Sequence, residues 1–227
     1  MKGYFTKFEK VLWVFSVSVI LISFLLFDKE NYLTLIASLI GVTSLIFCAK
    51  GNPTGQILMI IFSSIYGYIS LSYDYYGELI TYVGMTLPMS AIALVAWLKN
   101  PFKGRKSEVE VDKINKKDAV IMWVLTVIVT VILYFVLKYF GTANLLISTV
   151  SVTTSFLAVY LSYKRSPYFA LAYAFNDVVL IILWGLAAMD DISYLSVIIC
   201  FTVFLINDLY SFSNWIKMQK RQSESYK

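Results

Sequence analysis

Eight separate runs of mostly apolar residues, each 17 to 25 residues long, make up most of this 227-residue chain. A helix that crosses the hydrocarbon core of a bilayer needs about 20 such residues. The residues outside these runs are too few for a separate soluble domain, so we expect an all-α integral membrane protein. The predicted spans are 11–27, 32–49, 54–73, 79–98, 119–137, 143–163, 167–189 and 192–216.

The composition supports a membrane protein and excludes several kinds of chemistry. The chain is 59% hydrophobic and 15% charged, whereas soluble domains are about 45–50% apolar and about 25% charged. It has no histidine, which excludes histidine-based catalysis and histidine metal sites. Cys48 and Cys200 lie far apart in apolar runs and are interpreted as small buried residues. A phosphate-binding loop of the GxxxxGK[ST] type is absent, so the chain is not expected to use ATP. We predict no cofactor and no metal.

The cationic residues set the orientation. If the spans alternate in direction, 17 of the 19 lysines and arginines fall on the side that holds both termini. The opposite side keeps Lys29 and Lys138. Cytoplasmic loops are enriched in Lys and Arg, so we predict a multi-pass protein of the plasma membrane with both termini in the cytoplasm. The net charge of +5 then reflects topology, and no nucleic-acid partner is expected.

An internal repeat relates the two halves of the chain. Residues 40–44 (IGVTS) resemble 150–154 (VSVTT), residues 62–64 (FSS) align with 175–177 (FND), and Trp97 aligns with Trp215. The offset grows only across loops. We therefore predict two parallel three-helix bundles, formed by spans 2–4 and 6–8, with the fifth span as a linker helix and the first as an extra helix. In transporters built from such repeats, the substrate site lies between them near the bilayer midplane.

These features divide the chain into five predicted segments. The polar connection that begins the third segment carries seven of the cationic residues and is interpreted as a solvated linker. The segments are the cytoplasmic N-terminus with the extra span (1–31), the first repeat (32–98), the basic loop with the linker helix (99–142), the second repeat (143–216) and a cytoplasmic tail (217–227).

Two Asn-Asp pairs lie inside predicted spans. Asn176 and Asp177 are on the seventh span, and Asn207 and Asp208 are on the eighth. Both pairs lie about 13.5 Å from the cytoplasmic ends of their helices, so we predict that all four side chains meet and face the substrate. Intramembrane carboxylates usually mark substrate or proton routes. The alternative is a hydrogen-bonded cluster that only holds the two helices together.

The remaining candidate residues come from both repeats. Ser63 stands where the second repeat has Asn176, and Pro88 predicts a kink in the fourth span. Aromatic candidates for the site are Tyr66, Tyr173 and Trp184. Amide, carboxylate and aromatic groups together suit a flat heteroaromatic ring joined to a sugar, and a cationic ring would gain from both the carboxylates and the aromatic faces.

Several motifs resemble the PnuC family of vitamin-precursor transporters, whose cargo is chiefly nicotinamide riboside. The resemblance covers about residues 33–215. The motifs are AKGNPTGQ (49–56), SSIYGYI (63–69), YYGE (75–78), TLPM (86–89), RSPYFALAYAFND (165–177) and FLINDLYSFSNW (204–215).

The resemblance implies a fold similar to that of the SWEET sugar transporters, usually assembled as trimers. It implies facilitated diffusion of a small molecule, retained by a separate cytoplasmic kinase, and a substrate-binding asparagine at Asn176. Phe169 and Ala172 stand where familiar members carry tryptophans, and no glutamine occurs at 158–160, where the family has one. Thiamine, riboflavin and deoxynucleosides, which relatives transport, therefore remain alternative cargoes.

Two other functional classes fit less well. An intramembrane hydrolase could use Asp177 and Asp208 as paired carboxylates, but neither lies in a glycine-flanked motif, and the parallel repeat is typical of transporters. A receptor or scaffold subunit would need a larger docking surface than these short loops provide.

Overall fold

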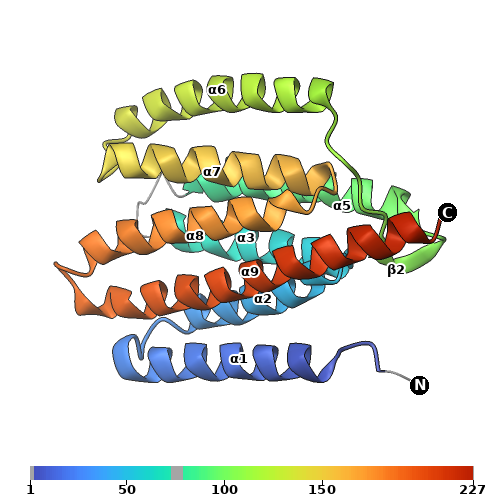
Figure 1. The fold of residues 1–227 in the computed structure, drawn as a ribbon. Helices are drawn as coiled ribbons and strands as arrows, with labels where there is room; N and C mark the ends of the chain where they lie inside the picture. Colours follow the sequence, from blue (N-terminus) through green and yellow to red (C-terminus); the bar gives the residue numbers. More distant parts are fainter. Residues whose placement is uncertain (1–2, 73–78, 227) are drawn as a thin grey trace.

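The computed structural model describes residues 3–72 and 79–226, and long helices dominate it (Figure 1). Within these ranges, eight helical segments are long and apolar enough to cross a bilayer, which confirms the predicted number of spans. The predicted third-span terminus at Tyr73 and the YYGE motif lie outside the described residues. Seven of the segments contain the helices α1 (Lys7–Phe27), α2 (Tyr32–Ala49), α3 (Thr54–Ser72), α6 (Lys116–Tyr139), α7 (Leu145–Tyr163), α8 (Tyr168–Ala187) and α9 (Leu195–Glu224), the last preceded by a 3-10 turn, η2 (Ile192–Tyr194).

The fourth span changes its helix type midway. A π-helical segment, η1 (Ile80–Thr86), leads directly into α5 (Leu87–Lys99). The N–H of Leu87 bonds to the carbonyl of Tyr82, five residues earlier. Pro88 follows in the first turn of α5. Because proline has no N–H and its ring crowds the preceding turn, the wider π turn accommodates it. This change of hydrogen bonding occurs where the sequence predicts a kink.

Six of the helical segments form a closed ring. Helix α2 packs on α3, α3 on α5, α5 on α7, α7 on α8, α8 on α9, and α9 returns to α2. The two remaining long helices lie outside the ring: α1 against α2 and α9, and α6 against α7. In Figure 1 they form the two outer layers of the molecule. The third helix of each predicted repeat thus packs on the first helix of the other repeat. The helices of both repeats together form one ring.

Two tryptophans hold the third helix of each repeat against the first helix of the other. The indole N–H of Trp97 on α5 donates to the carbonyl of Ser162 at the end of α7, at 2.8 Å. The indole N–H of Trp215 on α9 donates to the carbonyl of Cys48 at the end of α2, also at 2.8 Å. Both rings are fully buried, and their centroids lie 5.4 Å apart. The aligned tryptophans therefore make equivalent bonds, each to the opposite repeat.

The turns after α2 and α7 are equivalent as well. Each has a residue with positive φ, Gly51 at 65° and Arg165 at 55°. Its N–H bonds to the carbonyl three residues earlier, at 2.9 Å in both turns. Gly51 adopts this conformation without strain, whereas Arg165 gains an ion pair with Asp112 at 2.9 Å. The first helix of each repeat therefore ends in the same kind of turn.

The polar connection after α5 has many exposed side chains, in keeping with the solvated linker that the sequence predicts, but its backbone is ordered and packs on the ring; we call residues 101–112 the strap. It contains an antiparallel hairpin of β1 (Pro101–Phe102) and β2 (Arg105–Val109). The N–H of Val109 donates to the carbonyl of Gly51 at 2.8 Å, and the N–H of Asp112 donates to that of Arg165 at 3.1 Å. One short segment thus bridges the equivalent turns of the two repeats.

Helix α9 continues eight residues beyond the predicted span and packs on this strap. The side chain of Gln222 accepts from the N–H of Val111 at 2.8 Å and donates to the carbonyl of Val109 at 3.0 Å. Met218 and Gln222 are buried there, while Lys217 and Arg221 are exposed. The predicted tail at 217–227 is therefore mostly helical, because its apolar face has the strap to pack against.

Helix α1 is tied to the ring by a buried carboxylate. Thr6 and Glu9 form a capping box that starts the helix at Lys7. The Glu9 carboxylate also accepts from Lys50 Nζ at 3.0 Å and from the hydroxyl of Tyr210 at 2.9 Å. These contacts fix α1 against the end of α2 and the middle of α9.

Candidate functional site

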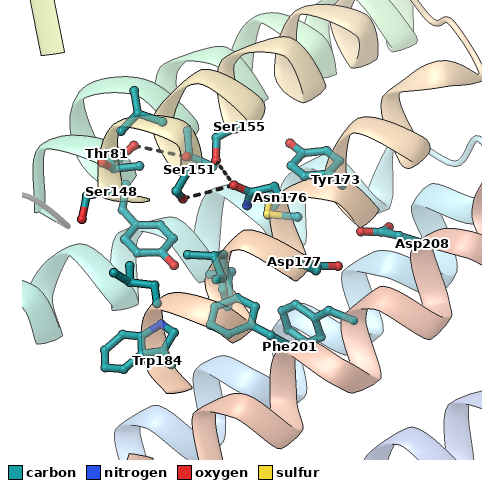
Figure 2. Close-up of a pocket in the computed structure, with 18 of the residues that line it drawn as sticks. Thr81, Ser148, Ser151, Ser155, Tyr173, Asn176, Asp177, Trp184, Phe201 and Asp208 are labelled. Carbon is teal, nitrogen blue, oxygen red and sulfur yellow. Dashed lines mark hydrogen bonds between the residues drawn. The ribbon is translucent and has the colours of Figure 1, made fainter. Parts of the chain in front are cut away.

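A cavity lies inside the ring and is lined by segments from both repeats (Figure 2). Helix α8 contributes the largest share of its polar groups, and the neighbouring α7 contributes Ser148, Ser151 and Ser155. The lining comprises Leu45, Met59, Phe62, Thr81, Tyr82, Thr86, Leu137, Thr142, Ser148, Ser151, Val152, Ser155, Tyr173, Asn176, Asp177, Leu180, Leu183, Trp184, Phe201, Phe204 and Asp208.

Asn176 is held by hydroxyl groups of α7. Its side-chain oxygen accepts from Ser151 Oγ at 3.1 Å, Thr154 Oγ1 at 2.8 Å and Ser155 Oγ at 3.1 Å. Residues three and four apart share one face of a helix, so these hydroxyls form one patch. Because the patch binds the amide oxygen, the amide nitrogen is left as a hydrogen-bond donor at the cavity wall.

Asp177 and Asp208 face each other across the junction of α8 and α9, as Figure 2 shows. Their exposed fractions are 4% and 2%. Oδ2 of Asp177 is buried without a hydrogen-bond donor in the described part of the chain. The approach of the two helices that the sequence predicts at this depth is observed for these two side chains.

Asn207 does not join them, contrary to the prediction that all four side chains meet. Its amide donates to Ser16 Oγ on α1 and to the carbonyl of Val203, both at 2.9 Å. Successive helical residues point about 100° apart, so Asp208 faces the cavity and Asn207 faces α1. The prediction failed because it placed α1 outside the repeats without giving it a contact with α9.

The other predicted site residues are divided between the cavity and the protein interior. Tyr173 and Trp184 line the cavity. Ser63 is fully buried and does not line the cavity. Tyr66 is also buried outside the lining, and its ring packs against that of Phe62, with 4.8 Å between the ring centroids. Sequence reasoning placed Ser63 by alignment with Asn176, but in the first repeat it is the neighbouring Phe62 that reaches the cavity.

The hydroxyl groups of α7 and η1 were missed by sequence reasoning. A signal was present, since Ser148, Ser151 and Ser155 are spaced three and four residues apart on one helical face. The aromatic residues from η1 and α9 had no such pattern. In those segments apolar and aromatic residues occur on every face, so their sequence does not reveal which side faces the cavity.

Aromatic rings close the cavity toward the end of the ring where the strap lies. Phe169 is one helical turn before Tyr173, and the two rings are 6.2 Å apart between centroids. Phe169 also packs on Trp97 at 6.2 Å and on Trp215 at 4.9 Å. With all three rings buried, this aromatic cluster separates the cavity from the strap.

Known proteins resemble this chain in sequence and in fold. Residues 31–217 match the family model described as nicotinamide mononucleotide transporter. A protein of Neisseria mucosa named nicotinamide riboside transporter PnuC is 26% identical over 97% of this chain and 85% of its own length. A protein of the same name from Haemophilus influenzae is 21% identical over 85% of this chain and 82% of its own.

A solved structure has the same fold over almost the full length of this chain. The crystal structure of the vitamin B3 transporter PnuC superposes with a TM-score of 0.81 and covers 97% of this chain and 95% of its own, at 22% identity. At this identity the likeness shows a shared fold. The family match spans all six segments of the ring, and the family and its named relatives are transporters, not enzymes. This chain therefore belongs to the nicotinamide mononucleotide transporter family, the family of the PnuC transporters, as its motifs implied.

Proposed function

We propose that this chain transports nicotinamide riboside across the membrane by alternating access. The observation that carries the proposal is the cavity between the two repeats in which Asn176, two carboxyl groups and several aromatic rings converge. Nicotinamide riboside joins a flat pyridinium cation to a ribose, so it needs aromatic faces, negative charge and hydrogen-bonding groups together. The names of the curated relatives support the same cargo.

The side chains divide this recognition between them. Asn176 donates its amide N–H to the carboxamide oxygen of the cargo. Tyr173 and Trp184 supply aromatic faces to the pyridinium ring, which gains a cation–π attraction. Asp177 and Asp208 balance its positive charge, and the hydroxyl groups of α7 lie on the wall that a ribose would approach. The residues that line the cavity are supported by buried side chains outside the lining, namely Ser63, Tyr66 and Asn207.

Movement through the ring needs no nucleotide hydrolysis by this chain, and we propose facilitated diffusion. The aromatic cluster formed by Trp97, Phe169 and Trp215 closes the strap side in the present conformation, so opening this cluster is the step that releases cargo there. Once released, the nucleoside is phosphorylated by a separate cytoplasmic kinase, and the added negative charge prevents its return. The homotrimer implied by the family resemblance is part of this proposal.

The chain is proposed to lie in the plasma membrane with both termini and the strap in the cytoplasm. The support is the concentration of lysine and arginine on that side. Single cysteines at Ser107 and Ser223 should react only with cytoplasmic reagents, and one at Ser193 only with external reagents. Both native cysteines are buried. Labelling of Ser107→Cys from outside would overturn the orientation.

Uptake into liposomes tests the cargo. Purified protein should accumulate radiolabelled nicotinamide riboside, and unlabelled nicotinamide riboside should compete better than thiamine, riboflavin or a deoxynucleoside. Trp184→Ala should reduce uptake, whereas Trp123→Ala, on the exposed face of α6, should not. Stronger competition by thiamine would transfer the proposal to that cation, and absence of uptake for all four would remove it.

A further inference from the structure

Three serines of α7 form a row along one wall of the cavity. Ser148, Ser151 and Ser155 are buried, and all three line it. They are three and four residues apart in the sequence, so they share one face of the helix. Because a helix rises about 1.5 Å per residue, Ser148 lies about 4.5 Å beyond Ser151, toward the N-terminal end of α7. This serine row therefore extends past the two serines that bind Asn176.

The hydroxyl hydrogens of the serine row are all used within the protein. Ser151 Oγ and Ser155 Oγ donate to Asn176 Oδ1, each at 3.1 Å. Ser148 Oγ donates to the carbonyl of Ala143, also at 3.1 Å. A serine hydroxyl has one hydrogen and two acceptor lone pairs. The row therefore presents acceptors to the cavity, and a cargo group can bond to it only by donating a hydrogen.

Asn176 and the serine row suit the two polar ends of the proposed cargo. The carboxamide oxygen of nicotinamide riboside accepts hydrogen bonds, and it is proposed to bond to the amide of Asn176. The ribose lies on the other side of the pyridinium ring, and its hydroxyl groups can donate. In Figure 2 Ser148 lies on the opposite side of Asn176 from Asp208. A cargo held at Asn176 by its carboxamide can thus extend its ribose toward Ser148.

We propose that Ser148 determines the sugar specificity of the site by accepting a hydrogen bond from the vicinal 2′,3′-diol of the ribose. This inference rests on the proposed function, because it takes the cargo to be a riboside bound at Asn176. The sugar is then recognised through the hydrogens that it donates. A sugar that lacks these hydroxyl groups, or carries acceptors in their place, leaves the serine without a donor.

The experiment compares two ligands on the full native chain. The Kd is measured by calorimetric titration for nicotinamide riboside and for an analogue in which fluorine replaces both hydroxyl groups of the diol. Fluorine is similar in size to a hydroxyl group but has no hydrogen to donate. Loss of one neutral hydrogen bond should make the Kd of the analogue about 2- to 12-fold higher. Equal Kd values would overturn the inference and leave the proposed function intact.

Ser148→Ala assigns the difference to this serine. It should raise the Kd of nicotinamide riboside by about 2- to 12-fold and leave that of the fluorinated analogue unchanged, because the analogue has no bond to lose. Thr153→Val removes a hydroxyl of α7 that bonds to Thr130 on α6 at 2.9 Å, and as the matched control it should change neither Kd.

Two results would contradict the inference in different ways. If Ser148→Ala weakens both ligands by the same factor, the serine is structural and the inference is overturned, while the proposed function stands. If the native chain does not bind nicotinamide riboside at all, the proposed function fails, and the inference that rests on it fails as well.

Discussion

Replacing Asn176 by alanine should separate a substrate contact from a structural one. The change removes the amide donor at the cavity wall and the acceptor of three hydroxyl groups. Thr154 keeps backbone acceptors, the carbonyls of Val150 at 3.0 Å and Ser151 at 2.9 Å. The hydroxyl groups that lose their acceptor are those of Ser151 and Ser155, and both line the cavity, where water can replace the amide oxygen.

The magnitudes follow from the cost of a lost hydrogen-bond partner in a buried site, about 1–3 kcal/mol. Loss of the amide donor to the cargo should weaken binding by about 5- to 150-fold. The free energy of unfolding should fall by an amount in the same range, about 1–3 kcal/mol. The two quantities are measured separately, the Kd by calorimetric titration with nicotinamide riboside and the stability by thermal unfolding in detergent.

Asn207→Ala is the matched control, because it removes the same side chain from the adjacent helix at a similar depth. It loses bonds to Ser16 and to the carbonyl of Val203, so its unfolding free energy should also fall by about 1–3 kcal/mol. Its Kd should stay within about twofold of the native value, since its amide faces α1. Equal losses of affinity in the two variants would refute the assignment of Asn176 to the cargo.

Five further substitutions test the ring and its ends. Trp97→Phe and Trp215→Phe each remove one indole donor, and both should lower the unfolding free energy by about 0.5–1.5 kcal/mol; strongly unequal losses would contradict their equivalence. Gly55→Ala should destabilise by about 1–3 kcal/mol, because its Cβ would lie 2.7 Å from a backbone nitrogen of α2, whereas Gly185→Ala meets nothing within 4 Å and should be neutral or stabilising. A hydrogen bond to the Asp118 carboxylate on α6 raises the pKa of Lys164 above its ordinary 10.5. The melting-temperature difference between the native chain and Lys164→Met should therefore be unchanged from neutral pH up to about 10.5 and shrink as the pH rises further.

The spans could be predicted because they rest on a strong local signal. A run of about 20 apolar residues has few alternatives to a membrane helix. Trp97 and Trp215 were aligned by sequence, and the structure gives them equivalent bonds. The alignment could not show that each tryptophan bonds to the opposite repeat, because a repeat in sequence does not say which copy each helix packs on.

The depth of the site residues could be predicted, but the direction of their side chains could not. Residue type and depth brought Asp177 and Asp208 together, but the direction of a side chain depends on every helix that packs nearby. Asn207 turned toward α1, and Phe62 took the cavity position that Ser63 was expected to fill. The strap was missed because the ordering of residues 101–112 depends on backbone contacts with Gly51 and Arg165, which no local pattern encodes.

A ring that closes through α9 has a consequence for how the protein is made. Cys48 and its partner Trp215 are 167 residues apart in the chain. At a synthesis rate of about 5–20 residues per second, α2 leaves the ribosome roughly 8 to 33 seconds before that partner exists. Through this interval the nascent chain is an open arc, and lipid or the insertion machinery must cover the face of α2 that α9 will occupy. A stop codon anywhere before α9 would leave that arc permanently open.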